Sequence, residues 1–351
     1  MQHTLEHIRA WIVRQWRVCK PLFVRYTKIL KDWIVRFWHI WTDRNNRWLS
    51  VPCTVAALLV LLVIVKSCQG IIYYNSNECR IYRLGYPIDQ ARALIAVLSE
   101  EQADSLIARG EHDTIAYPLL SQRYFIAENF NRYLAYHKKD TTLSALNDII
   151  ALVNVGHDRD RNDCAVPCDT GKRQLMLVNG RHYLDEHYKP DGLVDFKKTY
   201  CYVDQKALGV VVQAFVAMQQ ECKKQTDAQL MVNSAYRSYK EQIGTYKRNE
   251  KGYAARPGSS EHQTGLAIDV TSLQHPMRWA FDTSKEGVWM REHCHEYGFI
   301  LRYPKKQAHV MGYNYEPWHL RYVGVEVATR IHDEDITFDE YYAYYIEREK
   351  V

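Results

Sequence analysis

The second half of this 351-residue sequence predicts an α+β fold. Three short apolar segments have the length and composition of strands, and three longer segments carry helical signals. A mixture of strands with segregated helices indicates the α+β class. The predicted strands cover 230–233, 266–270 and 299–303, and the predicted helices cover 207–218, 239–246 and 287–297.

Each predicted helix rests on a local signal. The segment 207–218 has the apolar density of a buried helix. Ser238 precedes the segment 239–246 and is a residue type that begins helices, whereas Gly298 follows 287–297 and is typical of a helix end. These signals are local, so we expect the helix ends to be recognisable in the structure.

The strand at 266–270 is expected to be central because it is apolar up to Asp269. An unpaired charge at the end of a buried strand is costly, and a metal would remove that cost. The tyrosine-rich segment 338–346 predicts a final packing helix, with a partner-binding surface as the alternative.

Residues 74–160 predict a mostly helical module. Apolar residues recur there at helical spacing over 93–107 and 143–150. Because the module contains no chemical constellation, we expect a spacer or packing partner, and a cell-wall-binding role is the weaker alternative. The polar segment 161–172 predicts a linker or loop, and 173–351 the domain that carries the chemistry.

An apolar run at 51–65 predicts a transmembrane signal anchor over 51–73. The run is shorter than the roughly 20 residues that cross a bilayer, although Trp48 and Lys66 could extend it. The excess of Lys and Arg before the run places the N-terminus in the cytoplasm and the rest of the chain outside. A buried core helix is the alternative, and the long basic leader argues against a cleaved signal peptide.

Residues 1–50 form a basic, tryptophan-rich leader. They contain ten Lys or Arg against three acidic residues, a local net charge of +7, whereas the whole chain carries +5. Six of the nine Trp lie here, which suits either an amphipathic helix at an anionic membrane surface or a cytoplasmic tail. Beyond the leader and Lys66 the net charge is −3, so we expect no nucleic-acid partner.

Six cysteines follow the predicted span: Cys79, Cys164, Cys168, Cys201, Cys222 and Cys294. An even number is compatible with disulfides in an oxidising compartment, with the connectivity left open. The close spacing of Cys164 and Cys168 favours a local disulfide. Half of a structural zinc site is the alternative, but no second Cys or His pair with suitable spacing follows.

Two motifs carry the chemistry: Ser260-Glu-His-Gln-Thr-Gly-Leu-Ala-Ile-Asp269 and Glu316-Pro-Trp-His319. A catalytic zinc takes three protein ligands and leaves one position for water, whose pKa it lowers to about 7. His262, Asp269 and His319 supply such ligands, and Glu316 remains to take the proton of the water and pass it to a leaving amine. The two motifs therefore predict a zinc hydrolase.

The spacing within these motifs predicts irregular backbone. Side chains on a strand alternate between its faces, so an odd separation points them to opposite sides. His262 and Asp269 can converge only if the chain bends between them, and Gly265 permits such a bend. In the second motif, Pro317 supplies a similar irregularity.

Other residues that could carry chemistry are less convincing. His293, His295 and His309 lack a motif context and are interpreted as helix-surface or loop residues. The chain contains no Ser-x-x-Lys and no Gly-x-Ser-x-Gly, which argues against a serine mechanism.

Several ordered blocks resemble the VanY-type D-alanyl-D-alanine carboxypeptidases, zinc peptidases that share their catalytic fold with lysostaphin-type endopeptidases and the hedgehog signalling domain. The sequence departs from the family pattern at Ala235, where glycine is usual, and at Met311, where threonine often stands. Neither change removes a ligand, so both concern the fit of the substrate. The blocks are Leu177-Val-Asn179, Ser234-Ala-Tyr-Arg-Ser238, 257–269, Gly287-Val-Trp289, 297–304 and 315–324.

The resemblance implies an antiparallel sheet with flanking helices around a mononuclear zinc site. It places Zn2+ on His262, Asp269 and His319, the catalytic base on Glu316, and a catalytic substrate contact on Arg237. The planar guanidinium of Arg237 suits a terminal carboxylate. Further predicted substrate-binding residues are Ser260, Gln242 and Trp318.

The implied function is that of a membrane-anchored zinc-dependent D-alanyl-D-alanine carboxypeptidase, which trims the terminal D-Ala from peptidoglycan stem peptides outside a bacterial cell membrane. An LD-carboxypeptidase or a peptidoglycan endopeptidase on the same scaffold is the first alternative, because relatives with these motifs act on bonds of different stereochemistry. A non-catalytic zinc-containing cell-wall-binding module is an alternative of another class. The presence of Glu316 argues against it.

Overall fold

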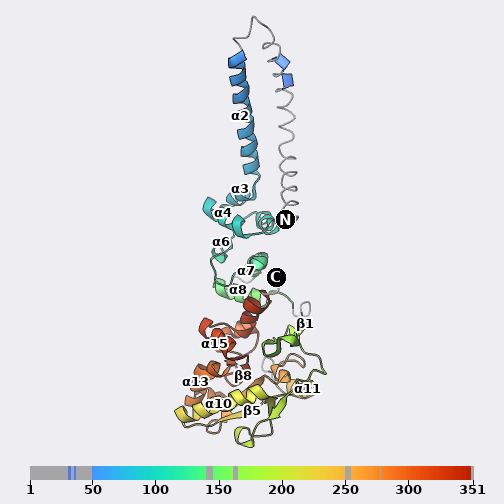
Figure 1. Ribbon diagram of the computed structural model, residues 1–351, viewed down its shortest axis with the longest axis vertical. Coiled ribbons are helices and arrows are strands. Elements are labelled where there is room, and N and C mark those ends of the chain that lie inside the picture. Colours follow the sequence, from blue (N-terminus) through green and yellow to red (C-terminus); the bar gives the residue numbers. More distant parts are fainter. Residues whose placement is uncertain are drawn as a thin grey trace. The chain divides into compact units, whose positions relative to one another are not determined.

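The structure, a computed structural model, describes residues 31–32, 35–36, 50–139, 145–160, 165–249, 254–276 and 278–348. The chain divides into two compact units, Met1–Leu134 and Ala135–Val351 (Figure 1). Apart from four positions and Ser50, the predicted tryptophan-rich leader lies outside the described residues. The expectations about the leader therefore stay predictions, as do the predicted domain boundaries.

All regular elements in the described part of the first unit are helical. Leu94 and Leu106 are fully buried, as the helical spacing of the apolar residues requires. Ser99 begins one helix with a capping box, because its side chain accepts from Gln102 N–H and its own N–H donates to the Gln102 side chain. The helices are α2 (Ser50–Tyr74), α3 (Asn77–Tyr82), α4 (Ile88–Val97), α5 (Glu100–Ala108), α6 (Ala116–Leu119), η2 (Ala127–Asn129) and the start of α7 (Phe130–Lys139).

The predicted membrane span falls on α2. Across the stretches that the structure describes, no helix combines the length and the apolarity needed to cross a bilayer. The apolar run is shorter than the roughly 20 residues that a crossing requires, and Lys66 and Gln69 interrupt the segment after it. The predicted transmembrane anchor therefore finds no support in the structure.

A four-stranded antiparallel sheet lies at the centre of the second unit, in the order β5-β6-β8-β7. All three neighbouring pairs are antiparallel, which confirms the sheet and the α+β class expected from the sequence. The strands are β5 (Leu230–Ser234), β6 (Ala267–Ser272), β7 (Phe299–Leu301) and β8 (His319–Tyr322).

The three predicted helices of this unit are present. Ser238 begins the second of them with a capping box, and Gly298 ends the third in the left-handed conformation at φ 82°. A side chain at Gly298 would also meet the ring of Tyr322 at 2.8 Å. The helices are α10 (Gly209–Thr226), α11 (Tyr239–Arg248), and α13 (Lys285–His293) with its continuation η6 (Cys294–Tyr297).

One hydrophobic cluster joins the sheet to two of these helices. Phe215 of α10 and Met290 of α13 belong to the same buried cluster as Ile268 of β6 and Leu320 of β8. The predicted packing helix at the C-terminal end is also confirmed, because α16 (Phe338–Tyr341) and the π-helical turn η8 (Tyr342–Ile346) that follows it are largely buried. This core fixes the strands that carry the predicted ligands.

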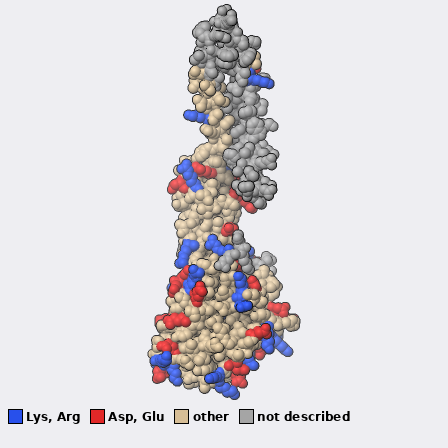
Figure 2. Space-filling model, viewed as in Figure 1, with Lys and Arg blue, Asp and Glu red and all other residues tan. Residues whose placement is uncertain are grey.

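Shorter elements complete the second unit. Two small two-stranded sheets pair β1 with β2 in parallel and β3 with β4 in antiparallel orientation. Basic and acidic side chains are interspersed over the face of this unit that Figure 2 shows. The elements are α8 (Leu146–Asn154), β1 (Val166–Pro167), η3 (Thr170–Leu175), β2 (His182–Tyr183), β3 (Leu193–Asp195), η4 (Lys198–Tyr200), β4 (Lys206–Leu208), η5 (Glu261–Thr264), α12 (Arg278–Thr283), η7 (Lys305–Gln307), α14 (Ala308–Met311), α15 (Val325–Glu334) and η8 (Tyr342–Ile346).

The cysteines whose side chains the structure describes are free thiols: Cys68, Cys79, Cys168, Cys201, Cys222 and Cys294. Cys168 is one of them, while its predicted disulfide partner Cys164 lies outside the described residues. Burial raises the pKa of Cys222 to about 11 and that of Cys294 to about 12. Both therefore stay protonated at neutral pH and pack as small apolar side chains in the core cluster.

Candidate metal centre

The sheet register brings two of the predicted ligands together. Strand β6 pairs with β8 so that Asp269 lies directly opposite His319. His262 comes from η5, the short 3-10 helix that precedes β6. The three side chains are almost fully buried, with relative exposures of 5% for His262, 4% for Asp269 and 4% for His319.

The backbone bends at the places that the spacing requires. Gly265 ends η5 in the left-handed conformation at φ 69°, and a Cβ there would lie 3.0 Å from Leu193 Cδ2. The chain thus passes from a helical turn into a strand between the first two ligands. In the second motif, His319 N–H donates to the Glu316 carbonyl oxygen at 3.2 Å, which closes a turn around Pro317.

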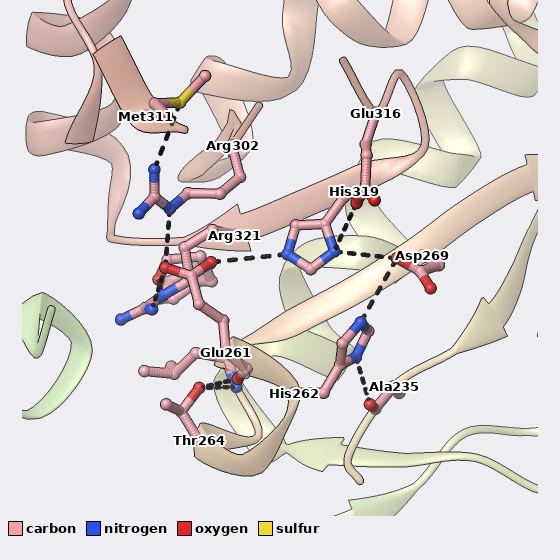
Figure 3. A network of polar contacts seen from close by, with 12 residues as sticks. Ala235, Glu261, His262, Thr264, Asp269, Arg302, Met311, Glu316, His319 and Arg321 are labelled. Atoms are coloured by element: carbon pink, nitrogen blue, oxygen red, sulfur yellow. Dashed lines mark hydrogen bonds and ion pairs between the residues drawn. The ribbon is translucent and has the colours of Figure 1, made fainter. Parts of the chain in front are cut away.

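The ligand atoms point toward one another (Figure 3). His262 Nε2 lies 3.5 Å from Asp269 Oδ1, and His319 Nδ1 lies 3.0 Å from the same oxygen. One ligand atom from each of the three side chains lies within 4.8 Å of the others. Two imidazole nitrogens and a carboxylate oxygen form a donor set that fits a divalent transition metal.

A backbone contact orients His262. Its Nδ1 donates to the carbonyl oxygen of Ala235 at 2.6 Å, which leaves Nε2 as the atom that faces Asp269. The departure from the family pattern at Ala235 does not affect this contact, since alanine has the same carbonyl group as glycine.

The charges at the centre are strongly coupled. Burial would raise the pKa of Asp269, but His262 and His319 outweigh this effect and hold the pKa well below its usual range. Burial lowers the pKa of His262. Burial would also lower that of His319, but the neighbouring carboxylates of Asp269 and Glu261 raise this pKa to about 9.

The remaining predicted site residues line one cavity together with the three ligands. They are Arg237, Gln242, Ser260, Glu316 and Trp318. Glu316 Oε2 lies 3.9 Å from His319 Nδ1, beside the ligand set. Trp318 packs edge-on against Trp279 with ring centroids 5.0 Å apart. The structure therefore brings all eight predicted residues to one place, while their roles stay predictions.

The three histidines set aside from the sequence lie elsewhere. His293 stacks on Trp289, His295 stacks on His332, and His309 pairs with Asp148 at 3.5 Å. Within the part of the chain that the structure describes, the only cluster suited to a metal ion is His262, Asp269 and His319.

One buried carboxylate at the centre was not singled out from the sequence. Glu261 lines the same cavity and lies 3.5 Å from His319 through its Oε2. The signal available was an acidic residue next to a ligand histidine, together with arginines in later blocks. That signal is weak, because sequence spacing does not reveal which arginine reaches the carboxylate.

An antiparallel sheet that gathers two histidines, an aspartate and a neighbouring glutamate places this protein among the metallopeptidases. The family model described as VanY, D-alanyl-D-alanine carboxypeptidase, matches residues 205–325. The bifunctional D-Ala-D-Ala dipeptidase and D-Ala-D-Ala carboxypeptidase VanXYC of Enterococcus gallinarum is 32% identical over 185 residues, which are 48% of this chain and 94% of that protein. The chain belongs to the VanY family.

Two further relatives match a similar share of the chain. YodJ of Bacillus subtilis (strain 168) is 36% identical over 186 residues, 48% of this chain and 66% of that protein. A D-alanyl-D-alanine carboxypeptidase of Enterococcus faecium is 35% identical over 185 residues, 50% of this chain and 60% of that protein. The chain thus spans less than two thirds of the length of either relative.

Proposed function

We propose that this protein is a zinc-dependent carboxypeptidase that removes the terminal D-Ala from peptidoglycan stem peptides. Family membership supports the reaction class, and the relatives from Enterococcus faecium and Enterococcus gallinarum are named for activity on D-Ala-D-Ala. The observation that carries the proposal is the convergence of three ligand atoms within 4.8 Å, beside Glu316 and Arg237 in one cavity.

His262, Asp269 and His319 would hold the zinc. Their donor set of two imidazoles and one carboxylate is that of catalytic zinc sites, which keep one position open. When bound, zinc supplies a Lewis acid that polarises a carbonyl group and acidifies water.

Glu316 is the proposed proton carrier. Its carboxylate lines the cavity and lies beside the ligand set without being needed to complete it. A carboxylate in this place can take a proton from the attacking water and deliver it to the nitrogen of the leaving D-Ala. Because the nitrogen receives this proton, D-Ala leaves as a neutral amine and not as an amide anion.

Arg237 is the proposed anchor for the free carboxylate of the substrate. Its guanidinium is oriented by hydrogen bonds to Gln242 Oε1 at 2.8 Å and to Ser234 Oγ at 2.7 Å. A planar guanidinium recognises a carboxylate through paired hydrogen bonds. Recognition of a chain end favours a carboxypeptidase over an endopeptidase.

The test is to incubate the purified full-length protein with pentapeptide and tetrapeptide stems and to weigh the products by mass spectrometry. We expect loss of one D-Ala from the pentapeptide alone, abolished by a chelator and restored by zinc. Loss from the tetrapeptide alone would instead establish an LD-carboxypeptidase, and cleavage of cross-linked stems an endopeptidase.

Two other outcomes would contradict the proposal more deeply. Binding of stem peptides without turnover would identify a non-catalytic module, and activity that survives complete removal of the metal would exclude the zinc mechanism. The first outcome requires a binding measurement with the same stem peptides, and the second is read from the chelator-treated sample.

We also propose that the second unit works outside the cytoplasm, where mature peptidoglycan lies. This placement requires that the apolar run at 51–65 crosses the membrane with the N-terminus in the cytoplasm. The basic leader before the run supports that orientation, because Lys and Arg stay on the cytoplasmic side. Reporter enzymes that are active on only one side of the membrane, fused after Val351, give the measurement. Activity of the cytoplasmic reporter alone would contradict the proposed placement.

A further inference from the structure

A buried carboxylate lies behind the candidate metal centre, on the side of His319 that faces away from Asp269 (Figure 3). It belongs to Glu261, whose side chain has 0% relative exposure. Two arginines enclose it, and their side chains are equally inaccessible, at 1% for Arg302 and 0% for Arg321. Three charged side chains in one buried cluster are expensive to desolvate, so their retention calls for a physical reason.

The arginines hold Glu261 through one of its two oxygens. Arg302 Nε donates to Glu261 Oε1 at 2.8 Å, and Arg321 Nη1 lies 3.0 Å from the same oxygen. The other oxygen, Oε2, has no hydrogen-bond partner and lies 3.5 Å from His319 Nε2. His319 Nε2 is also without a hydrogen-bond partner. Two unsatisfied buried polar atoms of complementary kind therefore face each other.

The other ring nitrogen of His319 faces the proposed metal. His319 Nδ1 lies 3.0 Å from Asp269 Oδ1, within the proposed ligand set. A neutral imidazole that uses Nδ1 as a metal ligand carries its proton on Nε2, and the acceptor of that proton determines the tautomer and the ring orientation. Among the described residues, Glu261 offers the acceptor next to Nε2.

The cluster around Glu261 is anchored on both sides. Arg302 also pairs with Asp339 of α16 at 2.7 Å, and Asp339 Oδ1 accepts from the Asn179 side chain at 2.6 Å. Arg321 donates to the carbonyl oxygen of Met176 at 2.7 Å. The carboxylate therefore has little freedom to move away from His319.

We propose that Glu261 is a positioning residue for the metal centre: its carboxylate accepts a hydrogen bond from the Nε2–H of His319, and His319 thereby presents Nδ1 to the metal. Arg302 and Arg321 keep the carboxylate in place, and Asp339 links this support to the C-terminal helix. This inference rests on the proposed function, because it requires that the centre binds a metal.

The test is Glu261→Gln in the full-length protein. The amide keeps the shape of the side chain but removes the charge and weakens the acceptor. We expect the zinc affinity, measured by competition with a chromophoric chelator, to fall about 10–100-fold, the range typical for partners of metal-ligating histidines. The visible absorption of the cobalt-substituted protein should change as well, because the orientation of one ligand changes.

Glu286→Gln is the matched control. Glu286 has 0% side-chain exposure and pairs with His275 Nδ1 at 2.7 Å, but it lies outside the candidate metal centre. We expect this variant to lose stability while keeping its zinc affinity and its cobalt spectrum. An equal fall in zinc affinity for both variants would mean that the loss of any buried carboxylate weakens zinc binding. This result would overturn the inference.

Glu261→Asp provides a second route if the glutamine variant does not fold. It keeps the negative charge that pairs with Arg302 and Arg321. The side chain is one methylene shorter, so its carboxylate oxygen lies farther from His319 Nε2. Reduced zinc affinity with intact folding supports the inference, whereas zinc affinity and cobalt spectrum equal to those of the wild type overturn it. If the wild-type protein itself binds no metal, the proposed function fails. This failure is distinct from failure of the inference about Glu261, because it is seen without any variant.

Discussion

The two units of the molecule bury different kinds of side chain. In the described part of the first unit, every buried side chain is hydrophobic, as with Leu94, Leu106 and Phe130. The second unit also has a hydrophobic core, but it additionally buries carboxylates, arginines and histidines, including Glu261, Arg302 and His319. Burying charge costs stability, so the buried charges of the second unit indicate that it carries chemistry. The buried side chains of the first unit serve packing.

Removal of a ligand should break the second unit's chemistry most completely. Asp269→Asn keeps the shape of the side chain but removes the charge that faces both histidines. We expect zinc affinity to fall by more than about 100-fold, beyond the range for outer partners of a metal site, and turnover to be lost. Metal analysis after dialysis provides the measurement. Wild-type zinc content in this variant would contradict the proposed ligand set.

Removal of the proton carrier should separate chemistry from metal binding. Glu316→Gln leaves the three ligands intact, so zinc should remain bound while kcat falls about 10²–10⁴-fold. Parallel measurements of zinc content and D-Ala release test this. Turnover close to that of the wild type would remove Glu316 from the mechanism.

A cavity in the first unit should lower stability and leave the chemistry of the second unit unchanged. Leu94→Ala removes a fully buried side chain and should lower the free energy of unfolding of that unit by about 2–5 kcal/mol. Zinc affinity and turnover of the folded protein should not change. Val97→Ala on the same helix is the control, because Val97 is 44% exposed, and its effect should stay within about 0.5 kcal/mol. Loss of zinc affinity in Leu94→Ala would contradict the separation of packing from chemistry.

The smallest expected effect is a dependence of stability on pH in the second unit. Burial lowers the pKa of His182 below its ordinary value of 6.5. Between the folded pKa and 6.5 the unfolded chain binds more protons, so stability is full above pH 6.5, falls on acidification and levels off below the folded pKa. The slope from one such group is at most about 1.4 kcal/mol per pH unit.

Denaturant unfolding from pH 7.5 to 5.5 measures this slope. His182→Gln should flatten the curve, and His187→Gln should not, because the His187 side chain is 86% exposed. Equal slopes for the wild type and both variants would show that burial of His182 contributes nothing to the acid sensitivity.

The parts of the fold that could be predicted are those with local causes. Ser238 begins α11 through a hydrogen bond within its own first turn, and Gly298 ends the helical segment because it adopts a left-handed conformation. The ability of a side chain to coordinate a metal is equally local. The structure brings His262, Asp269 and His319 together, while their role as ligands stays a prediction. The strands were recognisable by their composition, and their antiparallel order was expected from the resemblance to the VanY family.

Other features could not be predicted because they depend on distant parts of the chain. The partner of Glu261 at Arg302 lies 41 residues away. A local pattern can also mislead. The apolar run on α2 predicted a membrane anchor, for which the described structure offers no support.

The sequence by itself determined which side chains offer donor atoms, where Ser238 begins α11 and where Gly298 ends the helical segment, because side-chain chemistry and backbone propensity act over a few residues. The class of reaction was indicated by the resemblance to the VanY family. Only the tertiary structure decided which nitrogen of His319 faces Asp269 and which faces Glu261. That choice follows from the register of β6 against β8 and from the arginines behind the centre, and such pairings form only when distant segments pack together.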